Sequence, residues 1–138
     1  MATFDRRDSY SLGITFITVI GKVEHGEMAE FLGECDYESR SLKTLWDFRD
    51  ATWPNSPIKE LVEGLRTLFK YGREGQKTAF VYSTDVDFGI GRMLEPYFET
   101  FGMESQIWPF KNMNDALTWL AEDLKDDYDP LEYFKDLD

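Results

Sequence analysis

The sequence alternates short β-type runs with helical stripes, and this alternation constrains the fold more than any other feature. The clearest run, Ile14 to Ile20, is rich in β-branched and aromatic residues and ends at Gly21, which is typical of a largely buried strand. Residues 3–7 predict a shorter strand that pairs with it through a turn at residues 8–13. Three further strands are expected at residues 42–48, 77–83 and 104–110.

Amphipathic stripes between and after these strands predict four helices, at residues 28–35, 58–69, 86–101 and 113–124. Ser56 and Pro57 mark the start of the second helix, because serine caps the first turn and proline loses no hydrogen bond there. Pro96 falls inside the third stripe and should kink that helix or split it. Asn112 is expected to cap the fourth helix.

The predicted order of elements, ββαβαβαβα, defines the fold class. Strands separated by helices favour parallel neighbours joined by right-handed crossovers, whereas the first two strands form an antiparallel hairpin. We therefore expect an α/β domain over residues 1–124, with a mixed, mostly parallel sheet of about five strands and helices packed against it. Residues 125–138 form an acidic C-terminal tail, which is expected to dock on the domain, to fray, or to recruit a partner.

Composition limits the partners and the compartment. With 138 residues, of which 42% are hydrophobic, the chain suits one domain with its own core. Its formal net charge of -12 disfavours nucleic acid and anionic membranes as partners. No apolar run reaches the roughly 20 residues that span a bilayer. The single cysteine, Cys35, and the absence of a secretion signal predict a cytoplasmic protein without an internal disulfide.

The stretch STDVDFGIGRM, residues 83–93, looks like a glycine-rich phosphate loop. A dinucleotide fingerprint, however, needs its first glycine directly after the strand, and here six residues of the stretch precede Gly89. Thr84 or Asp85 is a better helix cap, which predicts that Gly89 and Gly91 lie inside the helix. Glycine in a helix costs about 1 kcal/mol relative to alanine. We therefore expect the two glycines to permit either close packing on the sheet or the approach of another group.

No metal, cofactor or nucleophilic centre is predicted. One histidine and one cysteine are too few for the usual zinc sites, and the aspartates at 126, 127 and 129 lack the central glycine of a calcium loop. His25 is expected in a solvated loop, and no nucleophile elbow accompanies it. Cys35 lies on the apolar stripe of its helix, so we expect it in the core.

Polar residues gather where two predicted strands end. Asp47 and Arg49 leave one strand and Ser83 leaves another, and open α/β sheets tend to bind ligands at that edge. Arg92, about two turns into the next helix, is expected to pair with Asp85 or Asp47, or else to contact a ligand. The candidate ligand-binding residues are Asp47, Arg49, Ser83, Thr84, Asp85 and Arg92.

Three segments, taken in order, point to a family. They are Trp46-Asp47-Phe48-Arg49, then Phe88-Gly89-Ile90-Gly91-Arg92-Met93, then Asp115-Ala116-Leu117-Thr118-Trp119-Leu120. Over roughly residues 8–122 the sequence resembles the SpoIIAA-like family of small bacterial proteins, which is related to STAS domains and sometimes labelled with the Sec14 lipid-binding group. The resemblance implies a mixed sheet of about five strands, and a regulatory or ligand-binding role in place of catalysis.

The same resemblance suggests a phosphorylation site. In the related anti-anti-sigma proteins a phosphorylatable serine opens the helix after the third strand. Ser56 keeps that position in this sequence, but the preceding acid and the following glycine are missing. A helix cap is the simpler role for Ser56.

Three hypotheses about function remain open. The first is a noncatalytic regulatory or ligand-binding module, whose ligand is a small molecule or lipid, or whose partner is a protein. The second is a phosphoregulated partner switch of the STAS type that uses Ser56. The third is a small enzyme that uses Asp47 and Asp85 for acid-base work. The sequence favours the first, assigns no cofactor, and leaves the ligand and homo-oligomer formation undetermined.

Overall fold

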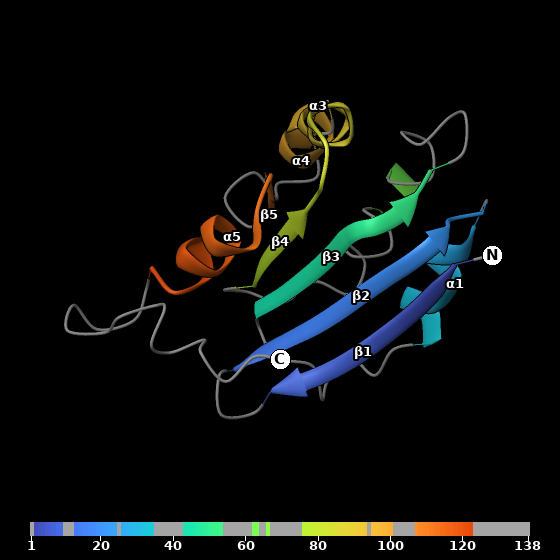
Figure 1. Cartoon of the computed structure of the whole chain (residues 1–138), viewed down its shortest axis with the longest axis horizontal. Helices are drawn as coiled ribbons and strands as arrows, with labels where there is room; N and C mark the ends of the chain where they lie inside the picture. The colour runs from blue at the N-terminus through green and yellow to red at the C-terminus, as the bar shows by residue number, and fades with distance from the viewer. Residues whose placement is uncertain are drawn as a thin grey trace.

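The computed structural model describes residues 2–9, 13–24, 26–34, 43–53, 62–63, 66, 76–93, 95–100 and 107–122. Within them the chain forms one five-stranded sheet with helices on both faces (Figure 1). Ser56, His25, Cys35, most of the predicted helix at 58–69, and the tail at 125–138 lie outside these residues. Of that predicted helix, residues 62, 63 and 66 are described and are helical.

The five strands lie side by side in chain order. They are β1 (Thr3–Ser9), β2 (Ile14–Lys22), β3 (Lys43–Thr52), β4 (Lys77–Val81) and β5 (Ile107–Phe110). β1 pairs antiparallel with β2, and the other three pairs are parallel. The predicted mixed, mostly parallel α/β sheet is therefore confirmed.

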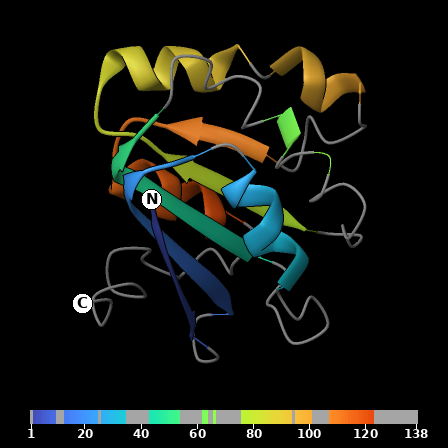
Figure 2. The same ribbon diagram turned by 90° about the vertical axis from the view of Figure 1, so that its right-hand side faces the viewer.

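The described helices are α1 (Glu27–Glu34), α3 (Asp85–Arg92), α4 (Glu95–Thr100) and α5 (Met113–Leu120). The predicted split near Pro96 is confirmed, because α3 and α4 are separate helices and Pro96 lies in the first turn of α4, where proline is tolerated. The predicted cap of α5 is also confirmed, since the Asn112 side chain accepts the Asp115 N–H at 2.9 Å. Figure 2 shows α3 and α4 following one another along the β5 side of the sheet.

Four predicted strand ends were wrong. β1 reaches Ser9 and not residue 7, and β2 reaches Lys22 and not Ile20. β3 continues to Thr52 beyond the predicted end at Phe48, because its pairing with β2 resumes at Asp50 and runs to Lys22 of β2. β4 stops at Val81, and α3 begins a few residues later. Asp47 and Arg49 therefore lie inside a strand and not after it.

The sheet face under α1 carries an aromatic core centred on Phe48. The centroid of its ring lies 5.1 Å from Trp53, 5.5 Å from Tyr82, 5.6 Å from Phe80 and 5.7 Å from Trp46. Aromatic side chains bury large apolar areas, and ring contacts at such distances add to that stabilisation. This cluster packs β3 and β4 together on the α1 side.

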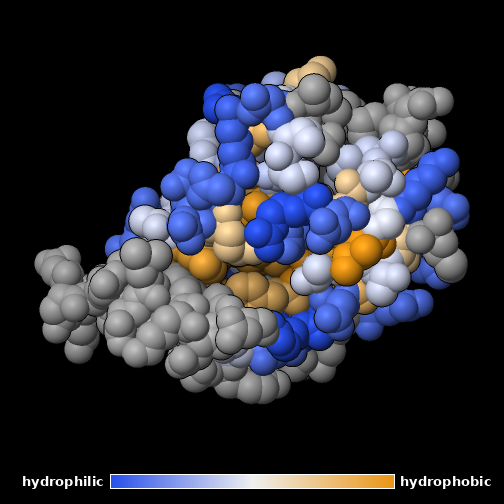
Figure 3. Space-filling model, in the orientation of Figure 1, coloured by the Kyte–Doolittle hydropathy of each residue, from blue (hydrophilic) through white to orange (hydrophobic). Residues whose placement is uncertain are grey.

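The opposite face is covered differently, by α5 alone among the described helices. Ala116 and Leu120 of α5 are buried against Leu45, Ala79 and Val81 of the sheet. Small side chains at this contact allow the helix to lie close to β4 and β5. No described helix lies over the same face of β1 and β2, and polar and apolar surface alternate there (Figure 3).

Gly89 lies inside α3, as predicted, so the stretch at 83–93 has no phosphate-loop geometry. The backbone carbonyl of Thr84 accepts the Phe88 N–H at 2.9 Å, which places the helix start where the sequence indicated. Of the two explanations expected for this glycine, close packing on the sheet is wrong for Gly89. A Cβ added at Gly89 would meet no atom within 4 Å.

A row of fully buried threonines crosses the α1 face, since Thr15, Thr44 and Thr78 are register partners on β2, β3 and β4. The Thr15 hydroxyl donates to Asp8 at 2.6 Å, and the Thr78 hydroxyl accepts from Gln76 at 3.3 Å. Within the described part of the chain, Thr44 Oγ1 has no hydrogen-bond partner. Burying such a group without a partner costs about 1–3 kcal/mol.

We expect Thr44→Val to raise the free energy of unfolding by about 1 kcal/mol, because valine keeps the branched shape and removes the unpaired hydroxyl. Urea unfolding of the variant and the wild type measures the difference. Thr15→Val is the matched control and should lower stability, since it removes the donor that Asp8 uses. Equal shifts in both variants would contradict the argument.

Candidate functional site

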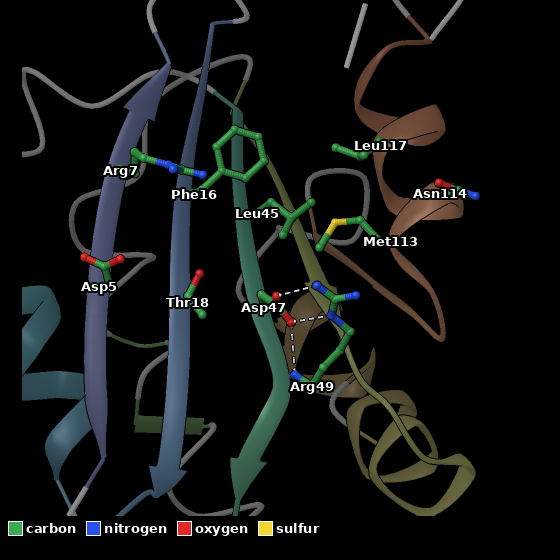
Figure 4. Close-up of a pocket in the computed structure, with 10 residues that line it drawn as sticks. All are labelled: Asp5, Arg7, Phe16, Thr18, Leu45, Asp47, Arg49, Met113, Asn114 and Leu117. Carbon is green, nitrogen blue, oxygen red and sulfur yellow. Dashed lines mark hydrogen bonds and ion pairs between the residues drawn. The ribbon is translucent and has the colours of Figure 1, made fainter. Parts of the chain in front are cut away.

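A groove of about 480 Å³ lies on the α5 face, between α5 and the open parts of β1, β2 and β3 (Figures 3 and 4). Cavities of roughly 300–1,000 Å³ are typical of small-molecule sites. The lining residues are Asp5 and Arg7 of β1, Phe16 and Thr18 of β2, Leu45, Asp47 and Arg49 of β3, and Met113, Asn114 and Leu117 of α5.

The pairing register arranges the floor of the groove in two rows. The first row is Asp5, Thr18 and Asp47, and the second is Arg7, Phe16 and Leu45. Because alternate residues of a strand share a face, both rows point into the groove. In Figure 4 the side chain of Arg7 extends from β1 toward Phe16. The floor thus combines an apolar centre with one polar row and an arginine at its outer edge.

The N-terminal half of α5 forms the wall. Met113 and Leu117 are four residues apart and therefore share one helix face, which is turned toward the groove. The Asn112 cap fixes the residue at which the helix begins, and buried Ala116 and Leu120 hold it on the sheet. The wall is therefore built on a helix and the floor on strands of the sheet.

Asp47 and Arg49 form a bidentate ion pair inside the groove. Nε of Arg49 donates to Oδ1 of Asp47 and Nη2 to Oδ2, both at 2.9 Å. The pKa of Arg49 is raised above its ordinary value, mainly by this hydrogen bond; burial acts against it, and the charges of Asp47 and Asp50 add smaller increases. Arg49 is therefore cationic at any physiological pH.

The same pair supports an irregularity in the sheet. Thr18 pairs with Asp47 but Ile20 pairs with Asp50, so β3 carries one residue more than β2 over this stretch. Arg49 falls in this gap. Its backbone N–H donates to Asp47 at 3.1 Å, and its carbonyl accepts the Ser83 hydroxyl at 3.0 Å. Two side chains thus replace the missing ladder bonds.

The predicted site residues do not all converge. Asp47 and Arg49 line the groove, whereas Ser83 supports the backbone of Arg49 from β4's end. Thr84 is exposed and begins the turn into α3.

Asp85 and Arg92 lie at the two ends of α3, outside the groove lining. Lys111 Nζ lies 3.0 Å from the Asp85 carboxylate, and the Arg92 guanidinium lies 5.5 Å from the ring centroid of Trp108. The sequence suggested that Arg92 pairs with Asp85 or Asp47; Asp47 is held by Arg49, and Asp85 lies beside Lys111. Arg92 therefore ties α3 to β5.

Sequence reasoning missed most of the groove. The residues that it did not select are Asp5, Arg7, Phe16, Thr18, Leu45, Met113, Asn114 and Leu117. The first strand carried little signal, because residues 5–9 are all polar and the alternation appears only in their burial.

In the described ranges, no group of three or more His, Cys, Asp or Glu side chains is placed to hold a metal ion. The same ranges contain no helix with the length and apolar character needed to cross a membrane.

Solved structures share this arrangement of strands and helices. An anti-sigma factor antagonist from Mycobacterium paratuberculosis superposes with a TM-score of 0.56 at 17% identity, covering 87% of this chain and 94% of that one. An uncharacterised protein with a SpoIIAA-like fold from Shewanella loihica gives 0.57 at 15% identity, covering 86% and 93%. The anti-sigma factor antagonist SpoIIAA in its unphosphorylated form gives 0.54 at 10% identity, covering 88% and 100%.

The chain therefore has a SpoIIAA-like fold, as the sequence resemblance implied. No protein-family model matches the sequence, and no curated protein matches it.

We expect Arg49→Met to lower the free energy of unfolding by about 1–2 kcal/mol, because it leaves the largely shielded Asp47 carboxylate without its two side-chain donors. Thermal or urea unfolding measures the loss. Lys111→Met removes a cation from a much more exposed pair and should change stability by less than about 0.5 kcal/mol. A larger loss for Lys111→Met than for Arg49→Met would overturn this ranking.

Proposed function

We propose that this protein is a noncatalytic regulatory module that binds a small amphipathic ligand in the groove beside α5. The observation that carries the proposal is the groove itself, in which an apolar floor adjoins a row of polar side chains. Sites of this kind usually combine apolar walls with a few placed polar groups. A regulatory role is supported by the fold, because two of the similar solved structures are anti-sigma factor antagonists.

The groove also suggests the chemistry of its ligand. It holds two carboxylates and two guanidinium groups, so its net charge selects neither anions nor cations. Arg49 uses Nε and Nη2 on Asp47, which leaves Nη1 as a donor on a guanidinium that is already held in place. We place the polar group of the ligand along Thr18 and Arg49, and its apolar body over Phe16 and toward Leu117. A small metabolite or a lipid fits this description.

A noncatalytic role is supported by the positions of the two carboxylates considered for acid-base work. Asp47 is bound by Arg49 within the groove. Asp85 is highly exposed at the start of α3 and lies against Lys111. The two carboxylates thus belong to different parts of the surface and have different cationic neighbours.

The phosphoregulated partner switch remains the second candidate, because antagonists of anti-sigma factors share the fold. Ser56, the serine that it requires, lies outside the described residues. Mass spectrometry of the protein from its own cells tests it. Absence of phosphate on Ser56 across growth conditions would remove this candidate without affecting the groove.

Anilinonaphthalene sulfonate, a fluorescent amphipathic probe, should bind the groove with enhanced fluorescence, and Leu117→Gln or Phe16→Ser should weaken binding about tenfold. Fluorescence titration of folded protein measures this. Trp108→Ser removes an apolar side chain that is 37% exposed outside the groove, and should leave the affinity unchanged. If only Trp108→Ser weakens binding, the groove is not the site.

Native mass spectrometry of the protein from its own cells identifies the natural ligand.

A further inference from the structure

One face of α3 is an exposed stripe in which a glycine lies between an acidic and a basic residue. Asp85, Gly89, Arg92 and Met93 are spaced at i, i+4, i+7 and i+8, so they share one side of the helix. The Asp85 side chain is 88% exposed and Met93 is 61% exposed. Figures 1 and 2 place α3 and α4 beside β5, at one end of the molecule.

Exposed apolar side chains are concentrated in this part of the chain. The large apolar residues exposed in the described ranges are Ile20, Met93, Tyr97 and Trp108. Three of these four belong to the α3–α4 segment or to β5, and Trp108 lies against Arg92. Exposed apolar side chains gathered on one surface mark a site of protein interaction more often than chance exposure does.

Gly89 adds an independent observation. A glycine weakens the interior of a helix, and this one is not required by its surroundings, because its backbone is helical and the space beside it is open. Open space at a glycine allows another backbone to come closer than any side chain would permit. The glycine is thus explained by a group that approaches from outside the domain.

The charges of this stripe are complementary to those of a second copy that runs in the opposite direction. Asp85 precedes Gly89 by about 6 Å along the helix axis, and Arg92 follows it by about 4.5 Å. If two α3 helices cross antiparallel at Gly89, Asp85 of each copy lies level with Arg92 of the other. Their helix dipoles then also run in opposite directions, which is favourable.

We propose that α3 is the contact surface of a homodimer in which two copies cross antiparallel at Gly89. The contact is a two-fold one, so each favourable charge pair occurs twice. Asp85 lies beside Lys111 in an exposed pair, and Arg92 lies over the Trp108 ring as one of its intramolecular contacts. Exposed ion pairs contribute little, so exchanging that pair for one across the interface costs little. Met93, one turn after Gly89, supplies exposed apolar area near the crossing.

Sedimentation velocity of the full chain, from low to high micromolar concentration, tests the dimer. Asp85→Arg alone and Arg92→Asp alone should each weaken dimerisation at least about tenfold, because each places like charges opposite one another. The double variant Asp85→Arg with Arg92→Asp should restore dimerisation, because it exchanges the two signs across the two-fold axis. Failure of the double variant to recover would overturn the geometry.

Gly89→Ala separates folding from association. It should raise the thermal midpoint under monomeric conditions and weaken the dimer, because alanine favours the helix but holds the second helix away. Ile20→Ser, on another exposed apolar residue, should leave the dimer unchanged. A chain that stays monomeric at every concentration, or a dimer that ignores all α3 substitutions, would overturn the proposal. Probe binding in the groove is expected to survive these α3 variants, so the two proposals can fail separately.

Discussion

The structure depends on β3 presenting Phe48 to one face of the sheet and Asp47 and Arg49 to the other. Phe48 lies at the centre of the aromatic core, and its two neighbours form the charged pair in the groove. Because successive strand residues point to opposite faces, a slip of one residue would move the ring into the groove and the charges into the core. The extra residue in β3 comes directly at this point, and Asp47 and Ser83 satisfy the backbone that it frees. The register of β3 therefore determines both the aromatic core on one face and the charged pair of the groove on the other.

In the residues that the structure describes, the two faces of the sheet differ in how completely they are covered. Large rings fill the α1 side, whereas small residues on β4 let the eight-residue α5 lie close to the other side. A single helix is about 10 Å wide and cannot cover five strands that lie about 4.8 Å apart. α5 packs on β4 and β5, and the floor of the groove is the part of the sheet beside it. The location of the groove is therefore set by where α5 packs and not by any special motif.

The elements were largely predictable because each has a local cause. Alternation of strand and helix patterns gave the order, Pro96 gave the split between α3 and α4, and Asn112 gave the start of α5. The end of β3 was not predictable, since it is fixed by pairing with β2. Most of the groove was missed for the same reason: a sequence shows which residues share a strand face but not which face a helix covers. The sequence left two explanations open for Gly89, close packing or the approach of another group, because the space around a glycine is a tertiary property.

Lys77, at the start of β4, has a consequence for the groove although it does not line it. Its Nζ donates to the carbonyl of Trp119 at 2.7 Å and lies 4.4 Å from the centroid of the Trp119 ring. A cation at this end of α5 stabilises the negative end of the helix dipole, while Asn112 closes the other end. Lys77 therefore anchors the C-terminal end of α5, and with it the wall of the groove, from the strand that lies beneath the helix.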